Sequence, residues 1–124
     1  MSAGAVARQG FAPHQRILTA AAFDAVYSQR VRAMDSFFSV NAAPNTLGYA
    51  RLGLSIGKKA VGNSVARNRV KRQVRESFRF NAANLPGLDL VVGARNSART
   101  AHNARLRESL DGLWKEIQKR CVVS

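Results

Sequence analysis

The sequence predicts a single α+β domain in which helices pack on one small mixed sheet, in the order αβββαβα. Three patterns support this fold class. Apolar residues recur at every third or fourth position in three segments, which is typical of amphipathic helices. In other short segments apolar and polar residues alternate, or several apolar residues follow one another, which is typical of strands. A length of 124 residues is enough for one hydrophobic core but short for two.

One helix is expected near the N-terminus, followed by strands. Thr19 can cap a helix on which Phe23, Val26 and Tyr27 share one face. The segment 37–41 then predicts a short strand that ends before a Pro-Asn turn signal.

The second strand of the middle region shows a clear alternation. In the segment 51–56, Leu and Ile alternate with Arg, Gly and Ser, which gives one buried face and one open face without bulky apolar groups. A further strand or hairpin between Asn41 and Tyr49 would complete three strands before the next helix.

Two helices with a strand between them complete the chain. The period changes to 3.6 after a loop, where Asn63 or Ser64 can cap a helix that runs to about Phe80. The apolar segment 88–94 predicts a strand, and the last residues, about 120–124, are expected to fray. The C-terminal helix has a core stripe made of Leu106, Leu110, Leu113, Trp114 and Ile117.

The charge balance indicates a polyanionic partner. Twenty Lys and Arg residues against seven Asp and Glu give a formal net charge of +13, with a pI near 11.6. A nucleic acid fits this balance. A membrane surface is the alternative, and it would require a basic amphipathic helix with a large exposed apolar face or a spanning apolar run, but the sequence has no such run. We therefore expect a nucleic acid.

The cations concentrate on the helix expected at 64–80. Val70, Val74, Ser77 and Phe78 form the strip that packs on the sheet, and Glu76 is the only acid of this helix. Solvated charged faces normally mix signs, whereas this one is almost entirely basic and mostly Arg, whose planar fork suits phosphate. The contiguous face predicted to bind RNA contains Arg67, Asn68, Lys71, Arg72, Arg75 and Arg79, and Arg69 widens it.

The compartment is expected to be the cytoplasm. The lone Cys121 excludes an internal disulfide and suits a reducing environment. The first 16 residues lack the apolar stretch of a secretory signal. They carry Arg8 and Arg16 and no acid, so a transit-like tail is an alternative, but we expect a flexible arm over about residues 1–12.

These residues resemble a known family. The segment 51–79, "RLGLSIGKKAVGNSVARNRVKRQVRESFR", is similar to the signature of the bacterial ribonuclease P protein subunit. It shows a Lys58-Lys59 pair and then the Arg67-Asn68-Arg69 hallmark at the start of the helix. The resemblance covers roughly residues 16–117, and the segment continues in the expected order with Lys71-Arg72, Arg75-Glu76 and Phe78-Arg79.

The resemblance implies a role in an RNA-based endonuclease. In this family a catalytic RNA removes the 5′ leader of precursor tRNA, and the protein is a noncatalytic subunit. The Mg²⁺ is held by the RNA, and one monomeric protein is expected per RNA. The fold implied is that of domain 2 of ribosomal protein S5, with a left-handed βαβ crossover.

The resemblance also implies two RNA contacts. The basic helix, together with Lys58 and Lys59 before it, would bind the catalytic RNA. A cleft between the first helix and the sheet would take the single-stranded leader. Its expected residues are Phe23, Tyr27, Phe37 or Phe38, and Arg51. Aromatic stacking on bases tolerates many sequences, as a protein that accepts many leaders requires.

No protein-based catalytic site is expected. The loop Gly57–Ser64 is close to a P-loop, but Asn63 stands where the phosphate-binding Lys is required. His14, His102 and Cys121 have no zinc-ligand spacing, and the seven acids are scattered along the chain. The favoured hypothesis is a noncatalytic protein subunit of an RNA-based endonuclease. One alternative is a ribosomal or RNA-chaperone protein, and another is a nuclease that acts without RNA.

Overall fold

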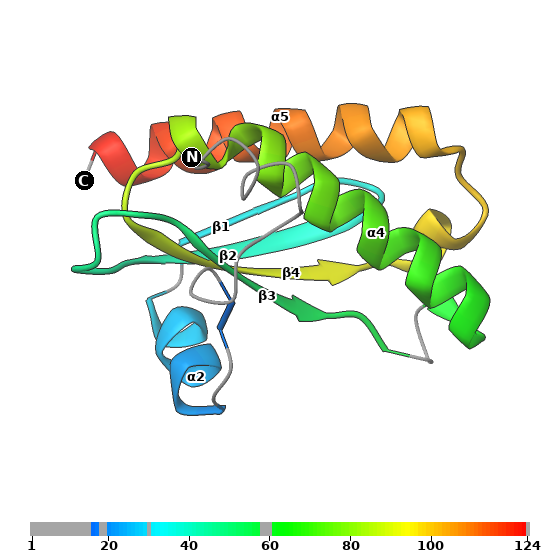
Figure 1. The fold of residues 1–124 in the computed structure, drawn as a ribbon, viewed down its shortest axis with the longest axis horizontal. Coiled ribbons are helices and arrows are strands. Elements are labelled where there is room, and N and C mark those ends of the chain that lie inside the picture. The colour runs from blue at the N-terminus through cyan, green and yellow to red at the C-terminus, as the bar shows by residue number, and fades with distance from the viewer. Residues whose placement is uncertain (1–15, 18–19, 30, 58–60, 124) are drawn as a thin grey trace, which may run out of the picture.

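The computed structural model describes residues 16–17, 20–29, 31–57 and 61–123. Helix α2 (Ala20–Ser28) is followed by strands β1 (Val31–Met34), β2 (Phe38–Pro44) and β3 (Arg51–Ser55). Helix α4 (Ser64–Asn81), strand β4 (Leu88–Ala94) and helix α5 (Asn103–Val123) complete the described part, with two short 3₁₀ helices, Ala82–Asn84 and Asn96–Arg99, on either side of β4 (Figure 1). The predicted order αβββαβα is confirmed.

The sheet is mixed, as expected. Its strand order is β1-β2-β4-β3, so β4 lies in the interior of the sheet. Strand β2 pairs antiparallel with β1 and β4, whereas β3 pairs parallel with β4. The chain passes from β3 through α4 to β4 in a left-handed sense (Figure 1), against the usual preference for right-handed crossovers.

The third strand of the middle region lies elsewhere than predicted. We expected it between Asn41 and Tyr49, but it is β1, which forms a hairpin with β2. The Asp35 carboxylate shapes the turn by accepting hydrogen bonds from the backbone N–H groups of Phe37, at 2.9 Å, and Phe38, at 3.0 Å. The strand predicted at 37–41 accordingly extends to Pro44.

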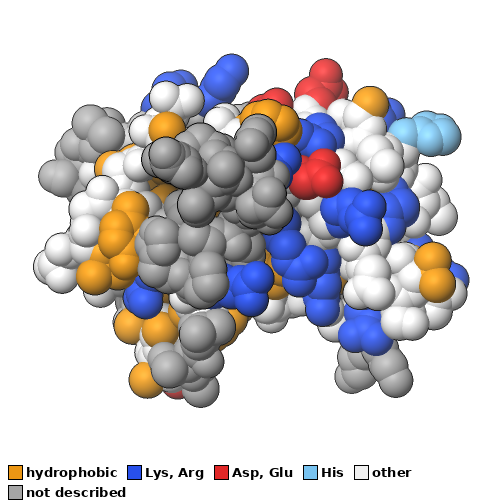
Figure 2. Space-filling model, viewed as in Figure 1, with side chains coloured by type: hydrophobic (Ala, Val, Ile, Leu, Met, Phe, Trp, Pro, Cys, Tyr) orange, Lys and Arg blue, Asp and Glu red, His pale blue; other side chains and the backbone are white. Residues whose placement is uncertain are grey.

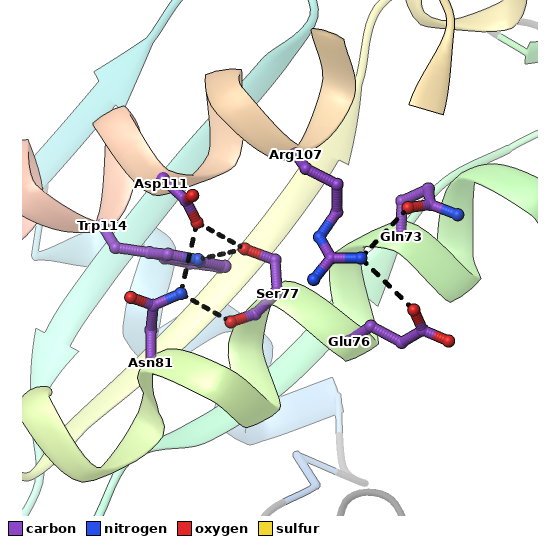
Figure 3. Close-up of polar contacts among 7 residues, drawn as sticks. All are labelled: Gln73, Glu76, Ser77, Asn81, Arg107, Asp111 and Trp114. Atoms are coloured by element: carbon purple, nitrogen blue, oxygen red, sulfur yellow. Dashed lines mark hydrogen bonds and ion pairs between the residues drawn. The ribbon is translucent and has the colours of Figure 1, made fainter. Parts of the chain in front are cut away.

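Helices α4 and α5 cover one face of the sheet (Figure 1), and this face holds the main core. The predicted strip of α4 and the predicted stripe of α5 are both buried. The Phe78 and Trp114 rings meet edge to face, with their centroids 6.2 Å apart, and the indole N–H of Trp114 donates to Ser77 Oγ at 2.8 Å. Figure 3 shows this contact with the neighbouring Asn81 and Asp111. Helix α4 is therefore packed against both the sheet and helix α5.

Helix α2 packs on the opposite face of the sheet (Figure 1) through a second, smaller core. That core contains Ile17, Val26, Ala43 and Val91. The Phe23 ring lies directly over Gly53 of β3. A side chain at position 53 would clash with the ring, since its Cβ would lie 2.7 Å from Phe23 Cζ. Glycine at this position lets the helix approach the strand closely.

The start of α4 is well defined. The Asn63 side chain accepts a hydrogen bond from the backbone N–H of Ala66 at 2.9 Å and caps the helix, which decides between the two predicted caps. Gly62 precedes it with a φ of 95°, a conformation that favours glycine. The predicted cap of the first helix, Thr19, lies outside the described residues. Among the described helices, none is long and apolar enough to cross a membrane.

Candidate nucleic-acid interface

Helix α4 presents its cations on the side away from the sheet. Val70, Val74 and Phe78 are completely buried beneath it, which fixes the rotation of the helix about its axis. Arg72 and Arg75 are exposed, and Lys71 and Arg79 are half-buried. We call the set Arg67, Asn68, Lys71, Arg72, Arg75 and Arg79 the basic face. Figure 2 shows Lys and Arg side chains gathered where α4 runs in Figure 1.

Arg67, Lys71, Arg72 and Arg75 of the basic face have no acidic ion-pair partner among the described residues. The ion pairs found there include Arg51–Asp89, Arg107–Glu76 and Arg120–Glu116. Cations one turn apart repel each other and destabilise a helix by about 0.2–0.5 kcal/mol per pair. A bound chain of phosphates would remove this repulsion.

Arg67 and Asn68 begin the basic face. Arg67 is half-buried, and its Nε atom is buried without a hydrogen-bond partner among the described residues. Asn68 is exposed beside it, so its amide can both donate and accept a hydrogen bond. Asn68 therefore adds an exposed polar group to the basic face, whereas the Nε atom of Arg67 is not accessible.

Arg69, which we predicted to widen the RNA-binding face, differs from the other cations of the helix in its contacts within the protein. Its Nη1 donates to Ala101 O at 3.0 Å and to Asn103 Oδ1 at 2.7 Å. Its Nη2 donates to Ala98 O at 3.2 Å and to Arg99 O at 2.8 Å. Because four of its N–H···O contacts are made within the protein, Arg69 ties α4 to the segment before α5. We therefore expect it to contribute less to RNA binding than the cations of the basic face.

Arg51 is also engaged within the protein. Its Nε and Nη2 donate to the two carboxylate oxygens of Asp89 at 2.8 and 2.6 Å, and Asn45 Nδ2 donates to Asp89 Oδ1 at 2.9 Å. Burial alone would raise the pKa of Asp89, but the hydrogen bonds from Arg51 and Asn45 outweigh it and lower that pKa. The hydrogen bond to Asp89 raises the pKa of Arg51. Arg51 therefore joins β3 to β4 at the end of the sheet.

A groove beside β3 connects the α2 face of the sheet to the basic face. The Phe23 ring is half-buried there, over Gly53. Arg75 of α4 lines the same groove. The groove is lined by Arg16, Ile17, Phe23, Leu52, Gly53, Leu54 and Arg75. An aromatic ring and two guanidinium groups thus line one hollow.

The other aromatic residues predicted for the cleft lie in different places. Tyr27 is 44% exposed on α2 and remains a candidate. Phe38 is completely buried in the core under α4 and α5, so the prediction that it lines the cleft is wrong. Phe37 is half-buried near α5, where the guanidinium of Arg105 lies 5.5 Å from its ring centroid. Phe37 lies in the turn before β2 and packs against the edge of the same core that buries Phe38.

Two further predicted residues lie outside the described part of the chain, namely Lys58 and Lys59. Arg16 is a groove residue that the sequence analysis missed. Its backbone bridges to Leu52 at the edge of β3, and no spacing pattern links it to Phe23 or Arg75. Among the described residues, no group of three or more His, Cys, Asp or Glu side chains could hold a metal ion.

Comparison with known proteins agrees with this geometry. The model of a family described as Ribonuclease P matches residues 11–118. The chain belongs to this family. It is 39% identical over 107 residues to the ribonuclease P protein component of Idiomarina loihiensis, covering 86% of each chain. It is 41% identical over 112 residues to that of Chromohalobacter salexigens, covering 90% of this chain and 88% of the relative.

Solved structures of ribonuclease P proteins share the fold. The protein from Staphylococcus aureus superposes with a TM-score of 0.78 at 31% identity, covering 82% of this chain and 94% of that one. The protein from Thermotoga maritima superposes with a TM-score of 0.73 at 29% identity, covering 82% and 96%. The mixed sheet with its helices is therefore the fold of this family.

Proposed function

We propose that the chain is the protein subunit of a ribonucleoprotein ribonuclease P, in which it assists a catalytic RNA in removing the 5′ leader from precursor tRNA. The observation that carries this proposal is the basic face, whose cations Arg67, Lys71, Arg72 and Arg75 have no acidic partner among the described residues. The helix that carries them is anchored by residues buried beneath it. Membership in the Ribonuclease P family supports the choice of RNA as the polyanion.

The basic face would bind the catalytic RNA. Arg72 and Arg75 can each place a planar, permanently charged fork against phosphate oxygens, and Asn68 can reach a ribose hydroxyl or a base edge. Neutralising RNA phosphates in this way would reduce the Mg²⁺ needed for the RNA to keep its active form. Lys58 and Lys59 are proposed to contact the RNA backbone beside the helix.

The groove beside β3 would take the leader. Phe23 offers a half-buried ring for an unpaired base, and Tyr27 offers a more exposed one on the same helix. Arg16 and Arg75 could hold the phosphates on either side of such a base. Arg51 would act here indirectly, through its pairing with Asp89 on the neighbouring strand β4, and Phe37 is a further proposed leader contact.

The chemistry would take place on the RNA. We propose that Mg²⁺ bound by the RNA supplies the charge stabilisation for phosphodiester hydrolysis, while this chain positions the substrate. One protein monomer per RNA is the expected composition, and the cytoplasm is the expected location, consistent with a single Cys.

Reconstitution tests the proposal. The purified protein alone should leave precursor tRNA intact, and at low Mg²⁺ it should restore 5′ maturation when added to a bacterial ribonuclease P RNA. Cleavage by the protein alone, in the absence of RNA, would support a nuclease instead. Binding to the RNA without any effect on maturation would support an RNA chaperone.

A substitution in the groove tests the leader contact. Phe23→Ala should reduce the preference for precursor tRNA over mature tRNA by about 5- to 100-fold, the range expected for loss of one stacked base. The measurement is the affinity of the reconstituted particle for each tRNA, with circular dichroism to verify folding. Equal preference in the variant and the wild type would return Phe23 to a purely structural role.

A further inference from the structure

Phe80 is an exposed aromatic side chain at the end of the basic face. It lies in the last turn of α4, directly after Arg79, and is 67% exposed although its neighbour Phe78 is completely buried. A single exposed apolar residue is ordinary on a protein surface. The environment of this ring is what distinguishes it.

Two guanidinium groups from different helices lie over the Phe80 ring. The Cζ atom of Arg79 is 5.3 Å from the ring centroid, and that of Arg107 on α5 is 5.6 Å away. Both distances fall in the range of cation–π contacts. The ring is therefore flanked by one guanidinium from α4 and one from α5.

Arg107 is itself held in position by α4. Its Nη1 lies 3.3 Å from Glu76 Oε1 and 3.5 Å from Gln73 Oε1, as Figure 3 shows. Gln73 is buried, and Glu76 is half-buried. These contacts fix the Arg107 guanidinium beside the Phe80 ring, and most of the Phe80 side chain stays accessible.

We propose that Phe80, flanked by Arg79 and Arg107, is a stacking site for an unpaired base of the RNA that binds the basic face. An accessible ring offers a base an apolar surface, and every base has a π-face that can stack on it. The flanking guanidinium groups suit the phosphates on either side of the stacked base, and either one can also stack on the base.

Charge favours RNA over a protein as the occupant of this site. A protein surface would have to supply carboxylates opposite Arg79 and Arg107 and an apolar pocket for the ring. An RNA strand already bound along α4 brings phosphates and bases at no further cost of association. The inference rests on the proposed function and extends it to a second helix.

The test uses variants of Phe80 in the full chain. Phe80→Ala should weaken binding to a bacterial ribonuclease P RNA by about 5- to 100-fold, Phe80→Leu should restore little of it, and Phe80→Trp should retain it. Because the side chain is exposed, these changes should leave folding intact. Leu47→Ala, which removes an exposed apolar side chain from the loop between β2 and β3, is the matched control and should bind like the wild type.

Tryptophan fluorescence gives a second readout. The added indole in Phe80→Trp should be quenched when RNA binds, beyond any change in the parent chain, whose single Trp114 is buried. Wild-type affinity in Phe80→Ala, or no extra quenching in Phe80→Trp, would overturn the stacking site while wild-type reconstitution still upheld the proposed function. Failure of the wild-type protein to bind the RNA would overturn both.

Discussion

Arg69 and Arg75 lie on the same helix, less than two turns apart, yet the structure gives them opposite surroundings. Arg69 faces the loop before α5 and donates to three backbone carbonyls and the Asn103 side chain. Arg75 is exposed, lines the groove beside β3 and takes part in no ion pair among the described residues. One arginine stabilises the fold, and the other is available to a ligand.

The same division separates the other arginines. Arg51 is bound by Asp89, whereas Arg72 has no acidic partner in the described part of the chain. The net charge of +13 therefore does not give the number of cations that are available to bind RNA. Cations that are already bound by groups of the protein should contribute less to RNA binding than cations without such contacts.

Removing Arg69 should give the largest loss of stability. Arg69→Ala leaves the carbonyls of Ala98, Arg99 and Ala101 without this donor, and water can replace it only partly, because two of the contacts are part-buried. We expect the free energy of unfolding to fall by about 1–3 kcal/mol in urea titrations. Arg75→Ala is the matched control and should change stability by less than about 0.5 kcal/mol. Equal losses in both variants would erase the distinction between them.

Breaking the Arg51–Asp89 pair should lower the free energy of unfolding by less than the loss of Arg69, and this loss should depend on pH. Asp89→Asn removes the negative charge facing Arg51, and we expect a loss of about 1 kcal/mol at neutral pH, since the pair is partly solvated. Affinity for the catalytic RNA should not fall, because Arg51 is not part of the basic face.

The sign of the pH effect follows from the lowered pKa of Asp89. The stabilisation is fully present above the ordinary aspartate pKa of about 3.9 and is lost as pH falls through the lower pKa of the folded chain. Thermal unfolding followed between about pH 6 and pH 2 should show a steeper acid loss in the wild type than in Asp89→Asn. Parallel curves would mean that this carboxylate is not stabilised by folding.

Sequence periodicity predicted the scaffold of the interface because burial has a regular spacing in helices. Val70, Val74 and Phe78 were expected under α4, and all three are completely buried. Burial of these three residues fixes the rotation of α4 about its axis, and this rotation directs Lys71 and Arg75 away from the core. The family resemblance added the left-handed crossover, which no pattern of residues indicates.

Contacts between distant segments could not be predicted in this way. The acceptors of Arg69 lie in the loop before α5, so its position on a helical wheel gave no sign of them. Phe37 and Phe38 are adjacent and equally apolar, and only the pairing of β2 decides that Phe38 faces the core. Strand β1 was missed because four residues, "VRAM", carry too little alternation to stand out.

The salt dependence of RNA binding tests the central claim most directly. Log affinity should be measured against log salt concentration for the wild type, Arg75→Ala and Arg69→Ala with the same ribonuclease P RNA. Arg75→Ala should flatten the slope by about 0.7–0.9, the share of one phosphate contact, and Arg69→Ala should leave it unchanged. A flattened slope for Arg69→Ala together with an unchanged slope for Arg75→Ala would contradict the account.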